Sequence, residues 1–244
     1  MYIDNLIFEV TRKCNMKCRH CLRGKAENIS MSAEVIKNAL KDVSDIGTLQ
    51  FTGGEPTLAL YQIRTIFKVI KENNISVGWI WLKSNGMIFS QALINYFADF
   101  QEYVDEPEMS ALEFSTDQFH AINNKSMGKY YNLSEYYKWI HISHKKPLLH
   151  VIKEGRAKKF IDRVVYHKPK FYSGWPIPEE YMKERYSTIA YEYPVYISSN
   201  GNVICGCDLS FKHIDNYSFG NVNKTPLKEI ISSKIQSEVQ SVFV

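Results

Sequence analysis

The segment CNMKCRHC, residues 14–21, brings three cysteines, Cys14, Cys18 and Cys21, into eight residues. It follows an apolar run closely, and the next such run ends in GGEP, residues 53–56. Three thiols this close in sequence can face one point, whereas structural zinc sites and iron-sulfur cubanes usually take four protein ligands. The spacing indicates either a metal centre with one open position or a partial zinc site.

The composition is typical of a globular chain. Hydrophobic residues make up 45% of the 244 residues and charged residues 23%, which argues against a disordered or coiled-coil chain. No stretch reaches the roughly 18 apolar residues of a membrane span, and the N-terminus does not resemble a signal peptide. The net charge of +4 gives no strong nucleic-acid signal. Because five cysteines, an odd number, argue against a disulfide scaffold, we expect a cytoplasmic protein with reduced thiols and no membrane association.

Short β-branched and aromatic runs alternate with longer segments of helical period. The predicted strands are 6–10, 48–52, 77–82, 111–115, 148–152 and 164–166, and the predicted helices are 33–44, 58–70, 91–100, 134–143 and a basic stretch from Arg156. Strands joined by helices pair in parallel, because each crossover needs a dozen or more residues. Six units are too few for an eight-unit barrel, so the predicted fold is α/β, a partial (β/α)6 TIM-like open barrel.

Polar motifs follow four of the predicted strands at the point where each strand ends. They are the cysteine segment, GGEP, the SNG of residues 84–86 and the STD of residues 115–117. In parallel barrels the active site lies at this rim. We therefore expect these four motifs to meet there.

The pattern changes after Lys168, where prolines interrupt an aromatic-rich stretch. Residues 195–198 and 203–205 flank Asn200-Gly201, a dipeptide that favours a tight hairpin turn, and a helix is predicted after Pro226. We predict a core over residues 1–168, followed over residues 169–244 by a linker and a small C-terminal hairpin-plus-helix appendage.

The cysteine spacing, together with GGEP after the next strand, resembles the radical SAM superfamily. The resemblance implies that Cys14, Cys18 and Cys21 hold a 4Fe-4S cluster, whose fourth iron binds the amino and carboxylate groups of S-adenosylmethionine. It also implies that an electron from the cluster cleaves S-adenosylmethionine to methionine and a 5′-deoxyadenosyl radical, which abstracts a hydrogen atom from a substrate.

The same resemblance implies contacts to S-adenosylmethionine. These are assigned to His20, Gly53, Gly54, Glu55, Ser84, Asn85 and Ser115. His20 would lie near the adenine, the GGE segment near the amino group, and Ser84 and Asn85 near the ribose. Many relatives have an arginine after the STD segment, where this chain has asparagines and a lysine at 123–125, so Arg156 is the alternative partner of the cofactor carboxylate. An ordinary loop carboxylate at Glu55 and a plain glycine turn before it are the alternatives.

Residues 196–231 resemble the C-terminal extension called SPASM, or its shorter Twitch form, which binds auxiliary iron-sulfur clusters. The extension normally has further cysteines downstream, whereas this chain has none after Cys207. Cys205 and Cys207 could bind an auxiliary metal with help from Asp208 or His213, act as a thiol pair, or pack in a small core.

The resemblance implies a radical SAM enzyme that acts on a substrate at the open rim. A peptide is the first substrate hypothesis, because SPASM-type enzymes often modify peptides, and a nucleoside or other small molecule is the alternative. An electron donor such as flavodoxin or ferredoxin is the implied partner. Other possibilities are an activating enzyme for a glycyl-radical partner, and a non-catalytic iron-sulfur or zinc protein.

Overall fold

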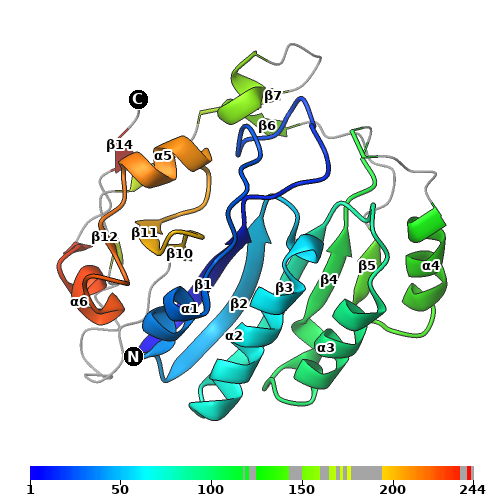
Figure 1. The fold of residues 1–244 in the computed structure, drawn as a ribbon, viewed down its shortest axis with the longest axis horizontal. Helices are drawn as coiled ribbons and strands as arrows, with labels where there is room; N and C mark the ends of the chain where they lie inside the picture. The colour runs from blue at the N-terminus through cyan, green and yellow to red at the C-terminus, as the bar shows by residue number, and fades with distance from the viewer. Residues whose placement is uncertain are drawn as a thin grey trace.

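The computed structural model describes residues 1–117, 119–120, 125–142, 150–159, 165–168, 171–172, 175–176, 194–236 and 241–242. Its central strands are β1 (Tyr2–Thr11), β2 (Asp45–Gly53), β3 (Ser76–Ser84), β4 (Ala111–Phe114) and β5 (Ile140–Ile142). They lie side by side in this order and all pair in parallel (Figure 1). The α/β, TIM-like open sheet that the sequence predicts is confirmed.

The strands form where apolar residues run almost without interruption, as expected for a parallel sheet covered on both faces. Residues 6–11 of β1 are all buried. In the register between β1 and β2, Leu6 lies opposite Leu49 and Phe8 opposite Phe51. All four of these side chains belong to the main hydrophobic core.

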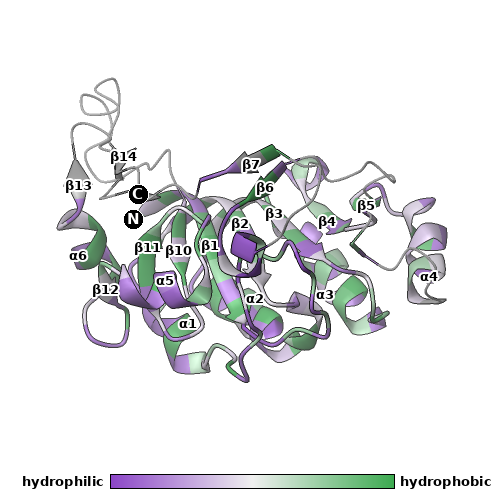
Figure 2. Cartoon of the chain, turned by 90° about the horizontal axis from the view of Figure 1, so that it is seen from above, coloured by the Kyte–Doolittle hydropathy of each residue, from purple (hydrophilic) through white to green (hydrophobic). Residues whose placement is uncertain are grey.

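Three helices, α1 (Ala33–Leu40), α2 (Leu60–Glu72) and α3 (Gln91–Gln101), pack on one face of this sheet, with their hydrophilic sides outward (Figures 1 and 2). Ser32 caps α1 and Ser90 caps α3, each accepting a hydrogen bond from a backbone N–H three residues later, at 3.2 and 3.1 Å. Two short 3-10 turns, η1 (Pro56–Leu58) and η2 (Pro107–Met109), complete the connections.

The segment after β4 differs from the sequence prediction. The predicted helix over residues 134–143 is wrong within the described residues, because α4 (Lys125–Ser134) ends where that helix was to begin and β5 follows it. Ile140 lies opposite Leu112 of β4, so the short β-branched run pairs with the sheet. Residues 143–149 lie outside the described part.

The predicted strands near 148–152 and 164–166 correspond to β6 (His150–Ile152) and β7 (Val165–His167), with residues 148, 149 and 164 outside the described part. These two strands pair in parallel with each other in a separate two-stranded sheet. The basic stretch between them begins as a 3-10 turn, η3 (Gly155–Lys159).

The C-terminal residues extend the main sheet. The predicted hairpin is confirmed as β10 (Val195–Ile197) and β11 (Asn202–Cys205), which pair antiparallel around Gly201, whose φ is +84°. β10 also pairs in parallel with β1, and β11 pairs with β12 (Gly220–Asn221). The helices α5 (Phe211–Asn216) and α6 (Leu227–Ser232) follow the hairpin, α6 directly after Pro226 as predicted.

Four two-residue strands make two further pairs. β8 (Phe171–Tyr172) pairs with β14 (Ser241–Val242), and β9 (Trp175–Pro176) pairs with β13 (Ile235–Gln236). The predicted boundary near residue 168, between the core and the C-terminal appendage, stays a prediction. Among the described helices, none combines the length and the apolar character that a membrane span requires.

Candidate active site

The cysteine segment leaves the carboxyl end of β1 and loops over that edge of the sheet (Figure 1). Its base is closed by backbone hydrogen bonds from Arg12 N to Ile29 O, 2.9 Å, and from Glu27 N to Arg12 O, 3.0 Å. Cys14, Cys18 and Cys21 are free and half-buried. The pKa of the Cys14 thiol is raised, chiefly by burial and also by the nearby Glu55 and the two other thiols.

The three thiols do not converge tightly enough for a single ion. Within the described part of the chain, the group whose ligand atoms all lie within 4.8 Å of one another is His20, Asp117 and His120, not the cysteines. A tetrahedral zinc with Zn–S bonds of about 2.3 Å would need its sulfurs closer together than that. A cluster of several irons spans a wider gap, so the residues present fit an iron-sulfur cluster with three thiolate ligands.

Arg156 of η3 holds the cysteine loop from the outside. Its backbone N donates to Cys21 O at 3.0 Å, and its Nε donates to Cys18 O at 2.9 Å. The preceding Gly155 has φ +56°, and a Cβ there would lie 2.2 Å from Leu22 O, so only glycine permits this approach. Arg156 therefore lies at the site as the sequence suggested, with its guanidinium engaged by the loop backbone.

Gly53 and Gly54 allow the loop after β2 to lie against the start of the cysteine loop after β1. Gly54 N donates to Thr11 O and Glu55 N donates to Lys13 O, both at 2.8 Å. A Cβ on Gly53 would lie 2.0 Å from Thr11 O, and one on Gly54 would lie 2.2 Å from Lys13 O. Both glycines are thus required because the two backbone segments touch. The alternative of a plain glycine turn does not explain this contact.

Glu55 is a buried hub, 1% exposed, whose two carboxylate oxygens are both occupied by this chain's own donors. Oε1 accepts from the backbone N and the hydroxyl of Thr57, at 3.0 and 2.7 Å, and from Ser84 Oγ at 2.8 Å. Oε2 accepts from Asn85 N at 2.9 Å. These four bonds compensate a buried charge and join the end of β2 to the end of β3.

Asn85, directly after β3, connects the end of that strand to the cysteine loop. Its side-chain Nδ2 donates to Asn15 Oδ1 at 2.8 Å, while its Oδ1 accepts from Met87 N at 3.0 Å. Ser115, at the end of β4, donates its backbone N to Ser84 O at 2.9 Å. The structure therefore brings the cysteine loop, GGE, SNG and Ser115 together, as the strand-end argument predicts.

His20 lies beneath the segment that follows β4. Its ring centroid is 4.3 Å from that of Phe119 and 5.7 Å from that of His120. Burial is the main cause that lowers the pKa of His20. Burial alone would also lower the pKa of His120, but hydrogen bonds to Asp117 and to the Cys18 side chain raise it to about 9.

A buried ionic network beneath the loop escaped the sequence analysis. Arg12, 1% exposed, donates from Nε to Glu9 at 2.7 Å, from Nη1 to Glu27 at 3.0 Å, and from Nη1 and Nη2 to the two oxygens of Asp215, both at 2.7 Å. Glu9 also accepts from the Tyr196 hydroxyl at 2.7 Å. A charged residue within the apolar run of β1 was the available signal, because a buried charge needs a partner.

This network, with neighbouring bonds, fastens the C-terminal residues to the cysteine loop. Phe211 N donates to Arg23 O at 3.1 Å, and Arg23 Nη1 donates to Leu209 O at 2.7 Å. Glu154, next to η3, pairs with His213 of α5 at 2.8 Å. Phe211 and Asp215 of α5 therefore support the two ends of the loop, at Arg23 and Arg12.

Cys205 and Cys207 face different surroundings. Cys205 is 3% exposed in the main core, where burial raises its pKa to about 12, whereas Cys207 packs on a smaller cluster around Tyr196 and Phe211. The apolar surroundings of both thiols are those of packed side chains, while the auxiliary metal of the sequence analysis stays a prediction.

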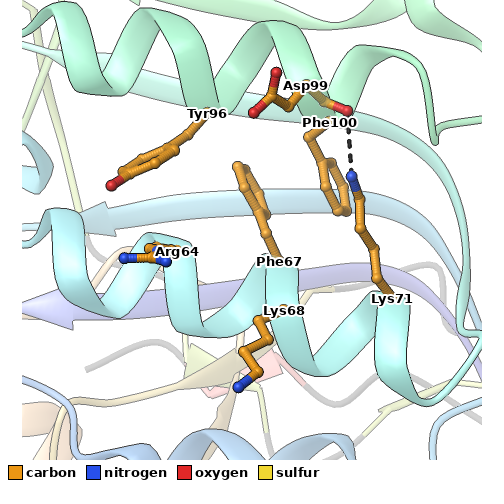
Figure 3. Close-up of a pocket in the computed structure, with 7 residues that line it drawn as sticks. All are labelled: Arg64, Phe67, Lys68, Lys71, Tyr96, Asp99 and Phe100. Atoms are coloured by element: carbon orange, nitrogen blue, oxygen red, sulfur yellow. Dashed lines mark hydrogen bonds between the residues drawn. The ribbon is translucent and has the colours of Figure 1, made fainter.

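A separate groove lies between α2 and α3 (Figure 3). Its lining residues are Arg64, Phe67, Lys68, Lys71, Tyr96, Asp99 and Phe100. Lys71 crosses it and donates to Asp99 O at 3.3 Å. None of the sequence-predicted site residues lines this groove, so it is not the rim site.

Two family models match the chain. Residues 8–153 match the radical SAM superfamily, and residues 190–242 match the iron-sulfur cluster-binding domain SPASM. Two curated relatives match short segments: an uncharacterized protein of Methanocaldococcus jannaschii is 33% identical over 74 residues, and YfkA of Bacillus subtilis is 30% identical over 69 residues. The matches cover 29% and 26% of this chain, but only 26% and 18% of the relatives' own length.

Solved structures share the fold. BtrN in complex with AdoMet and 2-DOIA has a TM-score of 0.54 and 14% identity, over 93% of this chain and 81% of that one. Native anSMEcpe with bound AdoMet and the Cp18Cys peptide has a TM-score of 0.57 and 16% identity, over 94% of this chain and 80% of that one. SuiB of Streptococcus suis bound to the precursor peptide SuiA has a TM-score of 0.52 and 12% identity, over 94% and 64%.

The family assignment agrees with the geometry. The superfamily model spans the strands whose ends form the rim, and the family uses a 4Fe-4S cluster and S-adenosylmethionine. The chain belongs to the radical SAM superfamily.

Proposed function

We propose that Cys14, Cys18 and Cys21 are the cluster ligands of this enzyme and that S-adenosylmethionine binds at the rim formed by the ends of β1 to β4. The supporting observation is that the free cysteine loop, the glycine contact and the Glu55 hub meet at one edge of the sheet. The three sulfurs lie too far apart for one zinc ion, which supports an iron-sulfur cluster over the zinc alternative.

The chain's own residues shape the cofactor site. When bound, the cluster supplies the electron that cleaves S-adenosylmethionine to methionine and a radical that takes a hydrogen atom from the substrate. Glu55 holds Ser84 and Asn85 in place, and Asn85 ties the rim to the cysteine loop. His20 offers a ring for the adenine, and Arg156 fixes the backbone of the loop.

We propose a peptide as the substrate. The fold is shared with anSMEcpe and SuiB, whose structures hold peptides, and the SPASM model matches the C-terminal residues. A small-molecule substrate is the second candidate, because BtrN, with the same fold, is in complex with 2-DOIA.

The substrate proposal is tested by adding substrate pools to the reduced, reconstituted enzyme. A peptide pool should increase the release of 5′-deoxyadenosine above the substrate-free rate, and one peptide should change mass. An increase with a pool of nucleosides and small metabolites, and none with peptides, would refute the peptide proposal and support the second candidate.

We further propose that an acidic one-electron carrier, such as flavodoxin or ferredoxin, docks on the cysteine loop in the cytoplasm. Residues 12–26 contain no acidic side chain, and three of their six cationic side chains are exposed. Lys17 and Lys25 are exposed on this loop, next to the cluster ligands. The five free cysteines of the chain support a reducing compartment.

Salt and lysine variants test this docking. Reduction by flavodoxin should slow as ionic strength rises and should be slower in Lys17→Ala, while Lys228→Ala on the exposed face of α6 should match the wild type. Equal rates in both variants, with no salt dependence, would refute docking on this loop.

A further inference from the structure

One face of the central sheet carries a row of side chains that the proposed cofactor site does not use. Along β3, Ile80 and Leu82 belong to the main hydrophobic core, and α1, α2 and α3 lie together on that side of the sheet (Figure 2). Because successive side chains of a strand alternate between its two faces, Trp79, Trp81 and Lys83 lie on the other side. These three residues form the β3 row.

The two tryptophans of the β3 row present apolar surface outside the core. Both are partly exposed, and neither belongs to a hydrophobic cluster of the described residues. Opposite Trp81 in the neighbouring strands lie Gln50 of β2 and Ala111 of β4. Since alanine has a single side-chain carbon, it leaves room beside the indole ring. An indole with an accessible side can hold an apolar side chain of a ligand.

Lys83 adds a charge at the end of the β3 row that is nearest the rim. Its Nζ is 2.9 Å from Glu113 Oε1 on β4, and its side chain is 52% exposed, against 21% for Glu113. The lysine is therefore the more accessible charge of the pair, and its ammonium has three donors, more than this one contact needs. Ser84 and Asn85, the proposed ribose contacts, follow Lys83 directly.

The other charges near the rim favour an anionic ligand. Residues 12–26 of the cysteine loop contain no acidic side chain. Glu55 accepts hydrogen bonds from Ser84 and Asn85, and Asp117 pairs with His120, so both of these carboxylates are already partnered. A carboxylate of a ligand thus finds a complementary charge at this edge of the sheet.

We propose that the substrate peptide lies along the β3 row, with an apolar side chain against Trp79 and Trp81 and an acidic side chain at Lys83. The inference rests on the proposed peptide substrate and adds its chemical class. From residue 79 to residue 83 the row spans about 13 Å, the length of about four residues of extended peptide. Lys83 is thus assigned as a specificity-determining residue.

The test uses short, end-capped, fluorescein-labelled peptides in three pools. Their sequences are random in uncharged residues, except for one central residue fixed as Glu, Gln or Lys. Fluorescence anisotropy measures their binding to the reconstituted protein in the presence of S-adenosylmethionine. We expect the wild type to bind the Glu pool most tightly and the Lys pool most weakly.

Lysine variants test the charge directly. Lys83→Met should weaken binding of the Glu pool about tenfold, the effect of losing one charge-assisted hydrogen bond, and should thereby remove the preference for it. Lys68→Met is the matched control, because Lys68 on the helix side of the sheet is also exposed and pairs with a glutamate, Glu72, at 3.6 Å. It should bind each pool as the wild type does.

Two further variants separate recognition from a change in stability. Glu113→Gln frees the ammonium of Lys83, so it should bind the Glu pool more tightly than the wild type, whereas a damaged fold would bind it more weakly. Trp81→Ala should weaken the binding of all three pools, because the apolar contact does not depend on the central charge.

The inference and its foundation fail in different ways. Equal binding of the three pools by the wild type, no binding of any pool, or an unchanged preference in Lys83→Met would overturn the inference. A preference for the Lys pool that is lost in Glu113→Gln would also overturn it, because Glu113 would then be the recognising group. A wild type that takes up no cluster and releases no 5′-deoxyadenosine would refute the proposed function itself.

Discussion

Replacing Glu55 by glutamine tests whether this carboxylate holds the rim together before any cofactor binds. In the structure, four donors of this chain surround its two oxygens. Glutamine has nearly the same shape, but one of the two oxygens becomes an NH2 group. If the amide keeps its oxygen at the Thr57 and Ser84 side, the NH2 group faces the N–H of Asn85.

The expected loss of stability follows from the replacement of one carboxylate oxygen by an NH2 group. The variant loses the 2.9 Å hydrogen bond from Asn85 N. It also places two donors, the new NH2 group and the N–H of Asn85, against each other at a site where Glu55 is 1% exposed. A hydrogen bond to a charged group contributes about 1.5–3 kcal/mol, and a buried unsatisfied donor costs about 1–3 kcal/mol. We therefore expect the free energy of unfolding to fall by about 3 kcal/mol, a large part of the roughly 5–15 kcal/mol of a typical domain.

The assay is urea unfolding of the cofactor-free protein. Glu72→Gln is the matched control, because this carboxylate on α2 is 59% exposed and its pair with Lys68 is 3.6 Å long. That control should change the free energy of unfolding by less than about 1 kcal/mol. Wild-type stability in Glu55→Gln, combined with lost binding of S-adenosylmethionine, would refute the structural role and make Glu55 a direct ligand.

Three further predictions concern the packing around the site. Gly54→Ala should destabilise the protein by about 3 kcal/mol or more, because its Cβ would lie 2.2 Å from Lys13 O, whereas a Cβ on Gly128 meets nothing within 4 Å. Burial alone would raise the pKa of Asp215, but Arg12 holds it below the ordinary 3.8. The ion pair therefore stabilises the fold above about pH 4 and is lost as the pH falls further, so Asp215→Asn should be less stable at pH 7 by about 1 kcal/mol and lose less on acidification. Cys205→Ala should retain the iron content of the wild type.

Each of these has a direct check. Urea unfolding compares Gly54→Ala with Gly128→Ala, and equal stability would show that the two rim loops do not touch. Unfolding from pH 7 to pH 2 checks Asp215, and an unchanged pH profile in the variant would show that Arg12 does not depress its pKa. Loss of iron from Cys205→Ala would show that this thiol binds metal.

The rim was predictable because it depends on local patterns. Parallel strands place their carboxyl ends at one edge, so a motif after each strand was enough to bring Cys14, Glu55 and Ser84 together. The cysteine spacing did not show what each side chain does there. Glu55 fitted the description of a free carboxylate until the structure showed both oxygens occupied.

The remaining features depend on contacts between distant residues. The parallel pairing of Val195 with Leu6 joins segments nearly 190 residues apart, and no local pattern encodes it. β5 has only three residues, so its period could not be distinguished from that of the preceding helix. The partner of Arg12, Asp215, lies in α5, and only the folded chain brings the two together.

The most direct test of the account is the amount of 5′-deoxyadenosine released when the anaerobically reconstituted, reduced protein is given S-adenosylmethionine, with iron counted per chain. We predict release by the wild type with about four irons, since one cubane takes three cysteines and an open position, and no release by Cys18→Ala. A wild type that binds zinc and releases no 5′-deoxyadenosine would contradict the account.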